Sequence, residues 1–294
     1  MTYHRIRFAV IGGDLRQIKL INLLASKGYQ VNMFGFDNKN IDSRVNLFNN
    51  IRELISDADI IVGPIPCSRD NKTVYSDYLD SSIMLEDIFK NISEDKIFMA
   101  GSITPQIKEI AEQYPFKVID LLEREELAIL NAIPTAEGAI LYAMGNSEIT
   151  IHGSKCLVLG FGKCGKVLAH KLKGLDADLT VEARKAEDLA LIKSYGYKAL
   201  YLQDLEKFIG DYDFIFNTIP ALILNRDLLQ KIKKSALIID IASKPGGVDY
   251  SAAKELGIQA ILAPSLPGKV APESAALIIY ETILNVIRDM GVII

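Results

Sequence analysis

The sequence is poor in the residues that build disulfide frameworks and metal sites. Its 294 residues include three cysteines, Cys67, Cys156 and Cys164, which is an odd number. They lack paired C-x-x-C spacing, so neither a disulfide framework nor a structural zinc site is expected. We therefore expect a protein of a reducing compartment with no metal ligands.

The sequence also lacks an excess of positive charge and any long apolar run. Its formal net charge of −4 and pI near 5.5, with no cluster of Lys and Arg, argue against nucleic acid and anionic membranes as partners. The apolar stretch at residues 8–11 is too short for a signal peptide, and no uncharged run approaches the roughly 18 residues of a membrane span. These absences predict a cytoplasmic protein.

The chain does contain a regular alternation of strand-like and helix-like segments. This alternation predicts parallel sheets with helices on both faces, and the length favours two domains. The fold class that we predict is α/β, with two doubly wound parallel-sheet domains. In the first third, the alternating segments are residues 7–11, 15–27, 31–36, 59–64, 96–100, 105–113 and 117–121. Further on, they are residues 155–159, 163–173, 178–183, 186–195, 214–217, 226–232, 236–241, 252–256 and 259–262.

A glycine-rich turn marks the second domain. It has the G-x-G-x-x-G spacing, follows the apolar run at 156–159 and precedes the helical segment at 166–172. In such turns the first glycine permits the tight bend, the second lets a pyrophosphate approach the backbone, and the third packs helix on strand. The turn therefore predicts a Rossmann domain that binds a dinucleotide through Gly160, Phe161, Gly162, Lys163, Cys164 and Gly165.

The domain boundaries follow from these segments. We predict an N-terminal α/β substrate domain over 1–133, an interdomain helix and linker over 134–150 that starts at Pro134, and the dinucleotide-binding domain over 151–272. The segment 273–294 has a broad apolar helical surface. It is expected to pack back on the first domain or on a partner subunit.

Two registers of the strand at 178–183 give different cofactors. If Ala183 stands at the position of the acidic residue of NAD sites, Arg184 and Lys185 face a 2′-phosphate and the cofactor is NADP. If Glu182 stands there, the cofactor is NAD. Alternation favours the first register, because Ala183 shares the inward face of Val181 whereas Glu182 points away.

The ends of two later strands are expected to reach the ribose and nicotinamide. Thr218, Ile219 and Pro220 follow one strand, and Ala242 and Ser243 follow the next. Asp240 could equally cap the turn that follows it.

Several motifs outside the glycine turn resemble the A-subunit family of bacterial dipicolinate synthases across essentially the whole chain. They are 11–14 (Ile-Gly-Gly-Asp) with Arg16 and Gln17, 123–125, 131–138, 151–154, 217–220, 245–247 and 263–268. The resemblance implies an NADP-dependent enzyme of sporulating bacteria that oxidises dihydrodipicolinate to pyridine-2,6-dicarboxylate in the cytoplasm. It also implies a flavoprotein-like B subunit as partner and the two-domain arrangement of formate and glycerate dehydrogenases. Lys163, Lys185 and Lys244 depart from the family's expected arginine, hydroxyl residue and arginine.

A flat ring with two carboxylates needs cations or N–H groups at both ends, while its hydride leaves toward nicotinamide. Because ligands of doubly wound sheets gather beyond the carboxyl ends of the strands, we expect a substrate rim there. Its predicted residues are Gly12, Gly13, Asp14, Gly35, Asp37, Pro64, Gly101 and Ser102, each of which could instead serve only as a turn residue. Candidates for holding the carboxylates are Arg16, Arg124, Asn131, Lys244 and Lys269.

Two of these residues could have no role in substrate binding: Arg124 could pair with neighbouring glutamates, and Lys269 could be solvated. Asp14, Glu137, a lysine or water could accept the proton, although Asp14 could also cap a helix. His4, His152 and His170 look structural or exposed.

Two other functions stay open at this point. The chain could be a non-catalytic NADP-binding subunit that positions or regulates a flavoprotein partner, or an unrelated two-domain 2-hydroxyacid dehydrogenase. A homo-oligomer is expected in either case.

Overall fold

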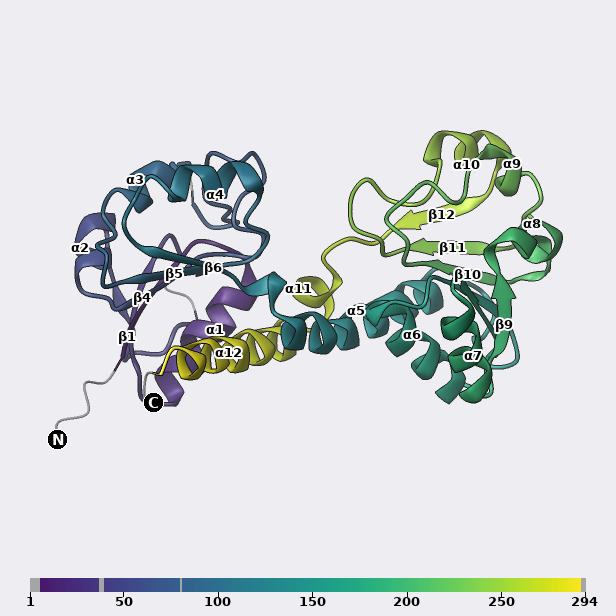
Figure 1. Cartoon of the computed structure of the whole chain (residues 1–294), viewed down its shortest axis with the longest axis horizontal. Coiled ribbons are helices and arrows are strands. Elements are labelled where there is room, and N and C mark those ends of the chain that lie inside the picture. The colour runs from purple at the N-terminus through teal and green to yellow at the C-terminus, as the bar shows by residue number, and fades with distance from the viewer. Residues whose placement is uncertain (1–5, 37–39, 80, 292–294) are drawn as a thin grey trace. The chain divides into compact units, whose positions relative to one another are not determined.

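The computed structural model describes residues 6–36, 40–79 and 81–291. His4 and Asp37, which were considered above, lie outside the described residues. The chain divides into two compact units, one formed by Met1–Ala128 with Pro272–Ile294 and the other by Ile129–Ala271. Each unit contains one parallel sheet with helices packed on it (Figure 1). The predicted fold class of two doubly wound parallel-sheet domains is confirmed.

The sheet of the first unit has the strand order β3-β2-β1-β4-β5-β6. The order reverses between β1 and β4, and doubly wound sheets bind ligands in the crevice beyond such a point. The strands are β1 (Arg7–Ile11), β2 (Gln30–Phe34), β3 (Asn46–Leu47), β4 (Ile60–Val62), β5 (Ile97–Ala100) and β6 (Lys117–Asp120). The helices are α1 (Leu15–Ser26), α2 (Ile51–Ser56), α3 (Leu85–Phe89) and α4 (Pro105–Ala111), followed by the 3-10 turn η1 (Leu121–Glu123).

The sheet of the second unit has the order β12-β11-β10-β7-β8-β9, and its order reverses between β7 and β10. The strands are β7 (Lys155–Leu159), β8 (Asp178–Ala183), β9 (Lys198–Tyr201), β10 (Phe214–Asn217), β11 (Leu237–Asp240) and β12 (Gln259–Leu262). The helices are α6 (Lys163–Gly174), α7 (Ala186–Ser194), α8 (Leu205–Phe208), α9 (Arg226–Leu229), α10 (Tyr250–Leu256) and α11 (Leu266–Val270), with 3-10 turns η2 (Leu202–Asp204) and η3 (Ile209–Asp211).

Alternating side chains of each strand fill separate apolar layers on the two faces of the second sheet. Val158 and Phe216 pack with Leu168 of α6 on one face, whereas Leu157 and Ile215 pack on the other. Strands covered on both faces need apolar residues at nearly every position. This requirement explains why their sequences are continuous apolar runs.

Several short elements were not predicted. Strand β3 has two exposed residues, β9 has one fully buried residue in four, and α2 and α3 have six and five residues. Elements of this length carry less than two periods of an apolar pattern, so periodicity cannot identify them. Strands β3 and β9 lie at the edges of the two sheets and bring each of them to six strands.

Helix α5 (Glu125–Gly145) corrects the predicted start of the interdomain helix. It begins at Glu125, and Pro134 lies inside it. Pro134 cannot donate to the carbonyl of Leu130, but Thr135 Oγ1 donates to the next carbonyl, that of Asn131, at 2.7 Å. The unit boundary falls at Ala128, earlier than the predicted one at 133.

Helix α5 also tests the expectation about membrane spans. Among the described residues it is the helix long and apolar enough to cross a membrane by length and composition, and 44% of its most apolar window is buried in the protein. Core helices pass the same test, so this is weak evidence for a span.

The C-terminal helix α12 (Pro272–Asp289) packs against α1 within the first unit (Figure 1). It buries Ala275, Ile279 and Ile283, and Lys19 of α1 lies 3.3 Å from Glu273. This apolar face explains why the chain returns to the first sheet after completing the second.

Candidate active site

A cavity of about 290 Å³ lies at the carboxyl end of β7, beside the glycine turn. Doubly wound sheets bind dinucleotides at this place. Nine of the residues predicted to hold the cofactor line the cavity, and Glu182 and Asp188 join them. The nine are Gly160, Phe161, Gly162, Ala183, Arg184, Lys185, Thr218, Ile219 and Pro220.

The three glycines of the turn have the steric roles that a dinucleotide requires. Gly160 has φ +90°, and a Cβ there would lie 2.6 Å from Thr218 Oγ1. A Cβ on Gly165 would collide with the carbonyl oxygen of Gly160, so helix α6 can approach β7 only without a side chain. A Cβ on Gly162 would meet no atom within 4 Å, which leaves room for a phosphate.

The N-terminus of α6 suits an anion. Gly162 is its N-cap and provides no side-chain cap, and no acidic residue lies in the first turn. Backbone N–H groups at a helix N-terminus bind phosphates well. Cys164, which follows Lys163, is half-buried, and burial raises the pKa of its thiol. It is therefore a protonated thiol rather than a nucleophile.

Glu182 lies on the opposite face of β8 from Val181 and Ala183, as alternation predicted. Its side chain is fully buried, and Oε2 accepts a hydrogen bond of 3.0 Å from Gly160 N. Oε1 is buried without a partner, and desolvation raises the pKa of the carboxyl. The carboxyl thus lies beneath the glycine turn and lines the cavity.

Ala183 and the two residues after it have different surroundings. Ala183 is 4% exposed and packs in the same apolar layer as Val181, as alternation predicted. Arg184 and Lys185 are exposed at the cavity, and Lys185 Nζ lies 4.0 Å from Glu187. Two cations and the carboxyl of Glu182 therefore line the cavity together at the end of β8.

Asp240 and Asn217 form a buried structural network. Both are fully buried, and Asn217 Nδ2 donates to Asp240 Oδ1 at 2.8 Å. Asp240 also accepts from Ala242 N, Gly247 N and the Tyr250 hydroxyl at 2.9–3.1 Å. The carboxylate holds the loop after β11 in place, which is the alternative role given for it above. Ser243 on that loop is exposed, and neither Ala242 nor Ser243 lines the cavity.

The predicted substrate rim of the first unit is largely covered by its own chain. Gly13 N donates to Tyr75 O at 2.8 Å, and a Cβ on Gly12 would lie 2.7 Å from the same oxygen. Arg16 is 5% exposed, forms an ion pair of 2.7 Å with Asp14 and donates to Ile65 O. Asp14 is also the N-cap of α1. Arg16 and Asp14 therefore hold this turn together and are not open to a ligand.

The other described rim residues differ in exposure: Pro64 and Gly101 are buried, Gly35 is half-buried and Ser102 is exposed. Gly101 is buried, and a Cβ there would lie 2.6 Å from Ile65. Ser102 is exposed with φ +60°, and its N–H donates to Asp120 at 3.0 Å. Gly35 has φ +83° and lies against Leu79, and Pro64 is buried.

Two predicted catalytic residues are engaged in ion pairs. Arg124 Nη2 lies 2.7 Å from Glu126 and 2.8 Å from Asp289, which raises the pKa of Arg124 further. Glu137 lies 2.7 Å from Lys171. Arg124 thus has the pairing role that its acidic neighbours suggested.

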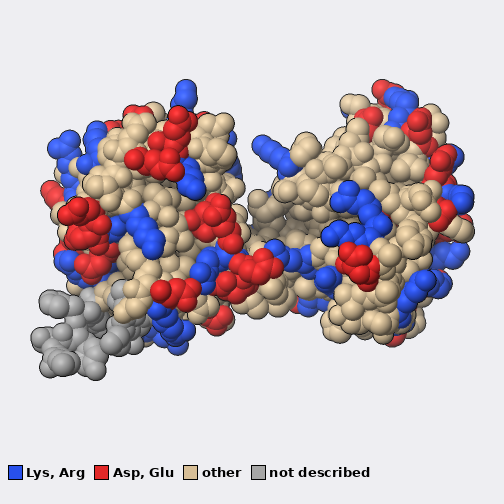
Figure 2. Space-filling model, in the orientation of Figure 1, with Lys and Arg blue, Asp and Glu red and all other residues tan. Residues whose placement is uncertain are grey.

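Asn131, Lys244 and Lys269 lie in the second unit and differ in exposure. Asn131 on α5 is half-buried. Lys244 and Lys269 are exposed, and among the described residues neither has an ion-pair partner. On the face shown in Figure 2, acidic and basic side chains are interspersed rather than segregated.

Comparisons with known proteins fit this geometry. A family model of the N-terminal domain of the dipicolinate synthase A subunit matches residues 7–122, and one of the D-isomer specific 2-hydroxyacid dehydrogenase NAD binding domain matches 136–248. The chain is 33% identical to the dipicolinate synthase A subunit of Bacillus subtilis (strain 168), over 97% of each protein. The chain belongs to the A-subunit family of dipicolinate synthases. The predicted family resemblance is thereby confirmed.

Solved structures agree with membership of this A-subunit family. The crystal structure of the dipicolinate synthase A subunit from Bacillus halodurans has a TM-score of 0.89 at 31% identity and covers 96% of this chain and 97% of its own. D-lactate dehydrogenase of Escherichia coli has a TM-score of 0.61 at 14% identity, with 97% of both chains covered, which shows the fold alone. The second unit is thus a dehydrogenase-type dinucleotide-binding domain, and the family supports an oxidoreductase that uses a nicotinamide cofactor.

Proposed function

We propose that the protein is the A subunit of a dipicolinate synthase that oxidises dihydrodipicolinate with NADP+. The reaction gives dipicolinate, NADPH and one proton. Family membership supports the substrate, and one observation supports the cofactor. Arg184 and Lys185 stand exposed at the cavity directly after Ala183, where an acidic residue would bind the ribose hydroxyls of NAD. Cations at this position suit a 2′-phosphate.

The described residues fit the proposed cofactor. Gly162 leaves open space, the N-terminus of α6 has no side-chain cap, and Gly160 and Gly165 allow the turn to close on β7. A nicotinamide cofactor held there would supply the hydride acceptor. The chain's own residues bind the phosphates and orient the adenosine, and Thr218 helps to shape the cavity while its hydroxyl donates to Leu159 O at 2.9 Å.

Three residues of the second unit stay candidates for contacting the substrate's carboxylates. Lys244, Lys269 and Asn131 are at least partly exposed, and the two lysines have no ion pair among the described residues. A lysine is a point charge, so it neutralises a carboxylate without the two-pronged geometry of arginine. We propose no such role for Arg16 or Arg124, because the guanidinium of Arg16 is buried against Asp14 and that of Arg124 pairs with Glu126 and Asp289.

Production of NADPH by the isolated chain tests the proposal. Full-length protein mixed with NADP+ and freshly generated dihydrodipicolinate is expected to give NADPH fluorescence together with dipicolinate. A chain that binds NADP+ but reduces none of it, with dipicolinate formed only when a flavoprotein partner is added, would contradict the proposal and identify a regulatory subunit. Turnover of simple 2-hydroxy acids in place of dihydrodipicolinate would instead identify a hydroxyacid dehydrogenase.

The cellular setting belongs to the same proposal. Family membership as an A subunit implies a B subunit, and we propose that this partner is flavoprotein-like. We also propose a homo-oligomer in the cytoplasm of the mother cell of a sporulating bacterium. Size measurement of the purified chain alone and with its partner tests both assemblies.

A further inference from the structure

The connection between β4 and α3 folds into a structured loop beside the first glycine turn. Tyr75 N donates to Cys67 O at 3.0 Å, and Val74 N donates to Ile83 O at 2.9 Å. The loop is joined to the turn through Gly13 N and Tyr75 O. A connection of about twenty residues with little regular structure is uncommon in a compact domain, and loops of this kind usually carry function. This one follows a strand at the point where the sheet order reverses.

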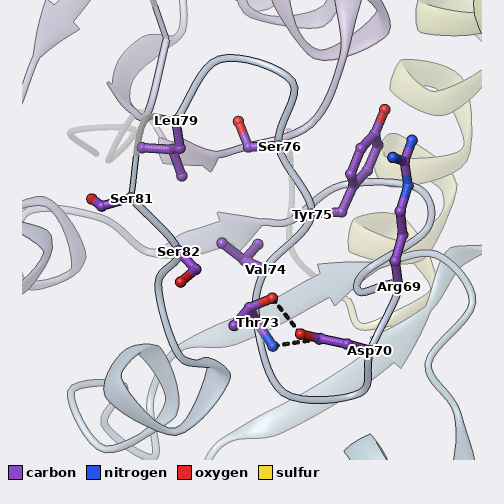
Figure 3. A pocket seen from close by; sticks show the side chains of 9 residues that line it. All are labelled: Arg69, Asp70, Thr73, Val74, Tyr75, Ser76, Leu79, Ser81 and Ser82. Carbon is purple, nitrogen blue, oxygen red and sulfur yellow. Dashed lines mark hydrogen bonds between the residues drawn. The ribbon is translucent and has the colours of Figure 1, made fainter.

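The loop lines an open surface cavity of about 290 Å³. Figure 3 shows Tyr75 and Arg69 side by side, with Ser81 and Ser82 on the opposite wall across Val74. Ser76 and Thr73 add hydroxyl groups to the lining, and Val74 and Leu79 add apolar surface. The cavity therefore combines a cation, hydroxyls and an apolar floor. Small-molecule sites have this composition.

Arg69 is an arginine whose charge is not neutralised by an ion pair. No carboxylate among the described residues lies within ion-pairing distance of it, in contrast to Arg16 and Arg124. Its guanidinium lies 4.0 Å from the centroid of the Tyr75 ring. Stacking on an aromatic ring orients a guanidinium while leaving its N–H groups free to donate. Arg69 is thus held in place and available to an anion.

Among the described residues, the two loop carboxylates near Arg69, Asp70 and Asp77, have other partners. Asp70 accepts hydrogen bonds from Lys72 N, Thr73 N and Thr73 Oγ1 at 2.8–2.9 Å, which hold the pKa of Asp70 well below its usual range. Figure 3 shows this carboxylate turned toward Thr73. Asp77 hydrogen-bonds with the Tyr75 hydroxyl. Asp70 is therefore engaged within its own loop, and Asp77, which does not line the cavity, is engaged with Tyr75.

We propose that this loop cavity binds a carboxylate group of the small acid on which the enzyme acts, with Arg69 as its two-pronged partner. A guanidinium matches the geometry of a carboxylate and binds it through two parallel N–H···O bonds. The volume suits one small ring. The identity of the acid as a pyridine or dihydropyridine dicarboxylate rests on the proposed function, whereas the site itself rests on Arg69 and the cavity.

Binding of dipicolinate to the full chain, measured by isothermal titration calorimetry, tests the site. Arg69→Ala is expected to weaken dipicolinate binding at least tenfold, because it removes both charge-assisted hydrogen bonds. Arg69→Lys is expected to restore part of the loss, since it keeps the charge without the fork. The matched control is Arg52→Ala, which removes an exposed arginine of α2 in the same unit. NADP+ binding, which reports the other unit, should stay unchanged in all three variants.

Each outcome of this experiment decides the proposal. Equal dipicolinate affinities of the wild type and Arg69→Ala would overturn it. So would inorganic phosphate that binds as tightly as dipicolinate and also needs Arg69, because the site would then be a phosphate site. If dipicolinate does not bind but another small carboxylate, such as malonate, binds in an Arg69-dependent way, the site stands and the proposed substrate is wrong. If no carboxylate binds, the site is wrong, whereas NADPH production from dihydrodipicolinate still tests the function separately.

Discussion

Arg184 is the residue on which cofactor choice depends most directly. It follows Ala183 at the cavity and is exposed, so its guanidinium is free to meet a 2′-phosphate. We expect Arg184→Ala to weaken NADP+ binding about tenfold or more, or about 1.4 kcal/mol, with little effect on NAD+. Fluorescence titration with each cofactor measures this. The control is Lys193→Ala, an exposed lysine of α7 away from the cavity; equal losses for both cofactors would show that the register is wrong.

Glu182 is expected to make stability depend on pH. Burial raises the pKa of its carboxyl, so the folded chain keeps a proton that the unfolded chain loses above about pH 4.3. Stability should therefore fall as pH rises from that value through the raised pKa. Urea unfolding at several pH values should show a smaller fall for Glu182→Gln than for the wild type. Glu148→Gln, at an exposed glutamate, should keep the wild-type slope; the same slope in all three proteins would contradict this role.

The residue-level predictions from sequence succeeded where the cause was local. The alternation of β8 places Ala183 inward, and the spacing of the glycines in the turn is itself a local pattern. The burial of Arg16 could not be predicted from the residues next to it in sequence. Its guanidinium donates to Ile65 O, which lies 49 residues away in sequence. Arg69 was missed for the same reason, since only the folded loop places it over Tyr75.

At the scale of elements, the first glycine turn and the loop after β4 depend on one another. Gly12 has φ +61°, and a Cβ there would lie 2.7 Å from Tyr75 O. We expect Gly12→Ala to destabilise the protein by about 1–3 kcal/mol, because the turn and the loop would have to move apart. Chemical denaturation measures this change. Gly145→Ala is the matched control, because its Cβ would meet nothing within 4 Å; equal stability of the two variants would show that the loop is not clamped.

The length of an element decides whether its position could be predicted from the sequence. Long segments such as α1, α6 and α12 carry several turns of an apolar pattern, so their positions were predicted within a few residues. The start of α5 was wrong, because a proline at a helix start and one inside a helix look alike in sequence. In the structure the helix begins at Glu125, and Leu127 and Ala132, which precede Pro134 on it, are buried.

At the scale of the whole molecule, the two units contain separate sheets and separate apolar cores. A ligand stabilises the folded form to which it binds, by about 2.7 kcal/mol at a hundred times its Kd. The proposed cofactor cavity lies within the second unit, whereas Gly12 lies in the first. Cofactor binding and the Gly12→Ala substitution should therefore act on different parts of the protein.

Hydrogen exchange followed by mass spectrometry separates these effects by residue. Saturating NADP+ is expected to slow exchange of amides in β7, β8 and α6 more than in β1 and β4. Gly12→Ala should speed exchange in β1 and in the loop after β4, and NADP+ should not restore it. If NADP+ protects both sheets equally, or if Gly12→Ala abolishes NADP+ binding, the two units act as one cooperative structure. The idea that the cofactor cavity and the Arg69 site belong to independently folding units would then lose its physical basis, because a change in either unit would be felt throughout the chain.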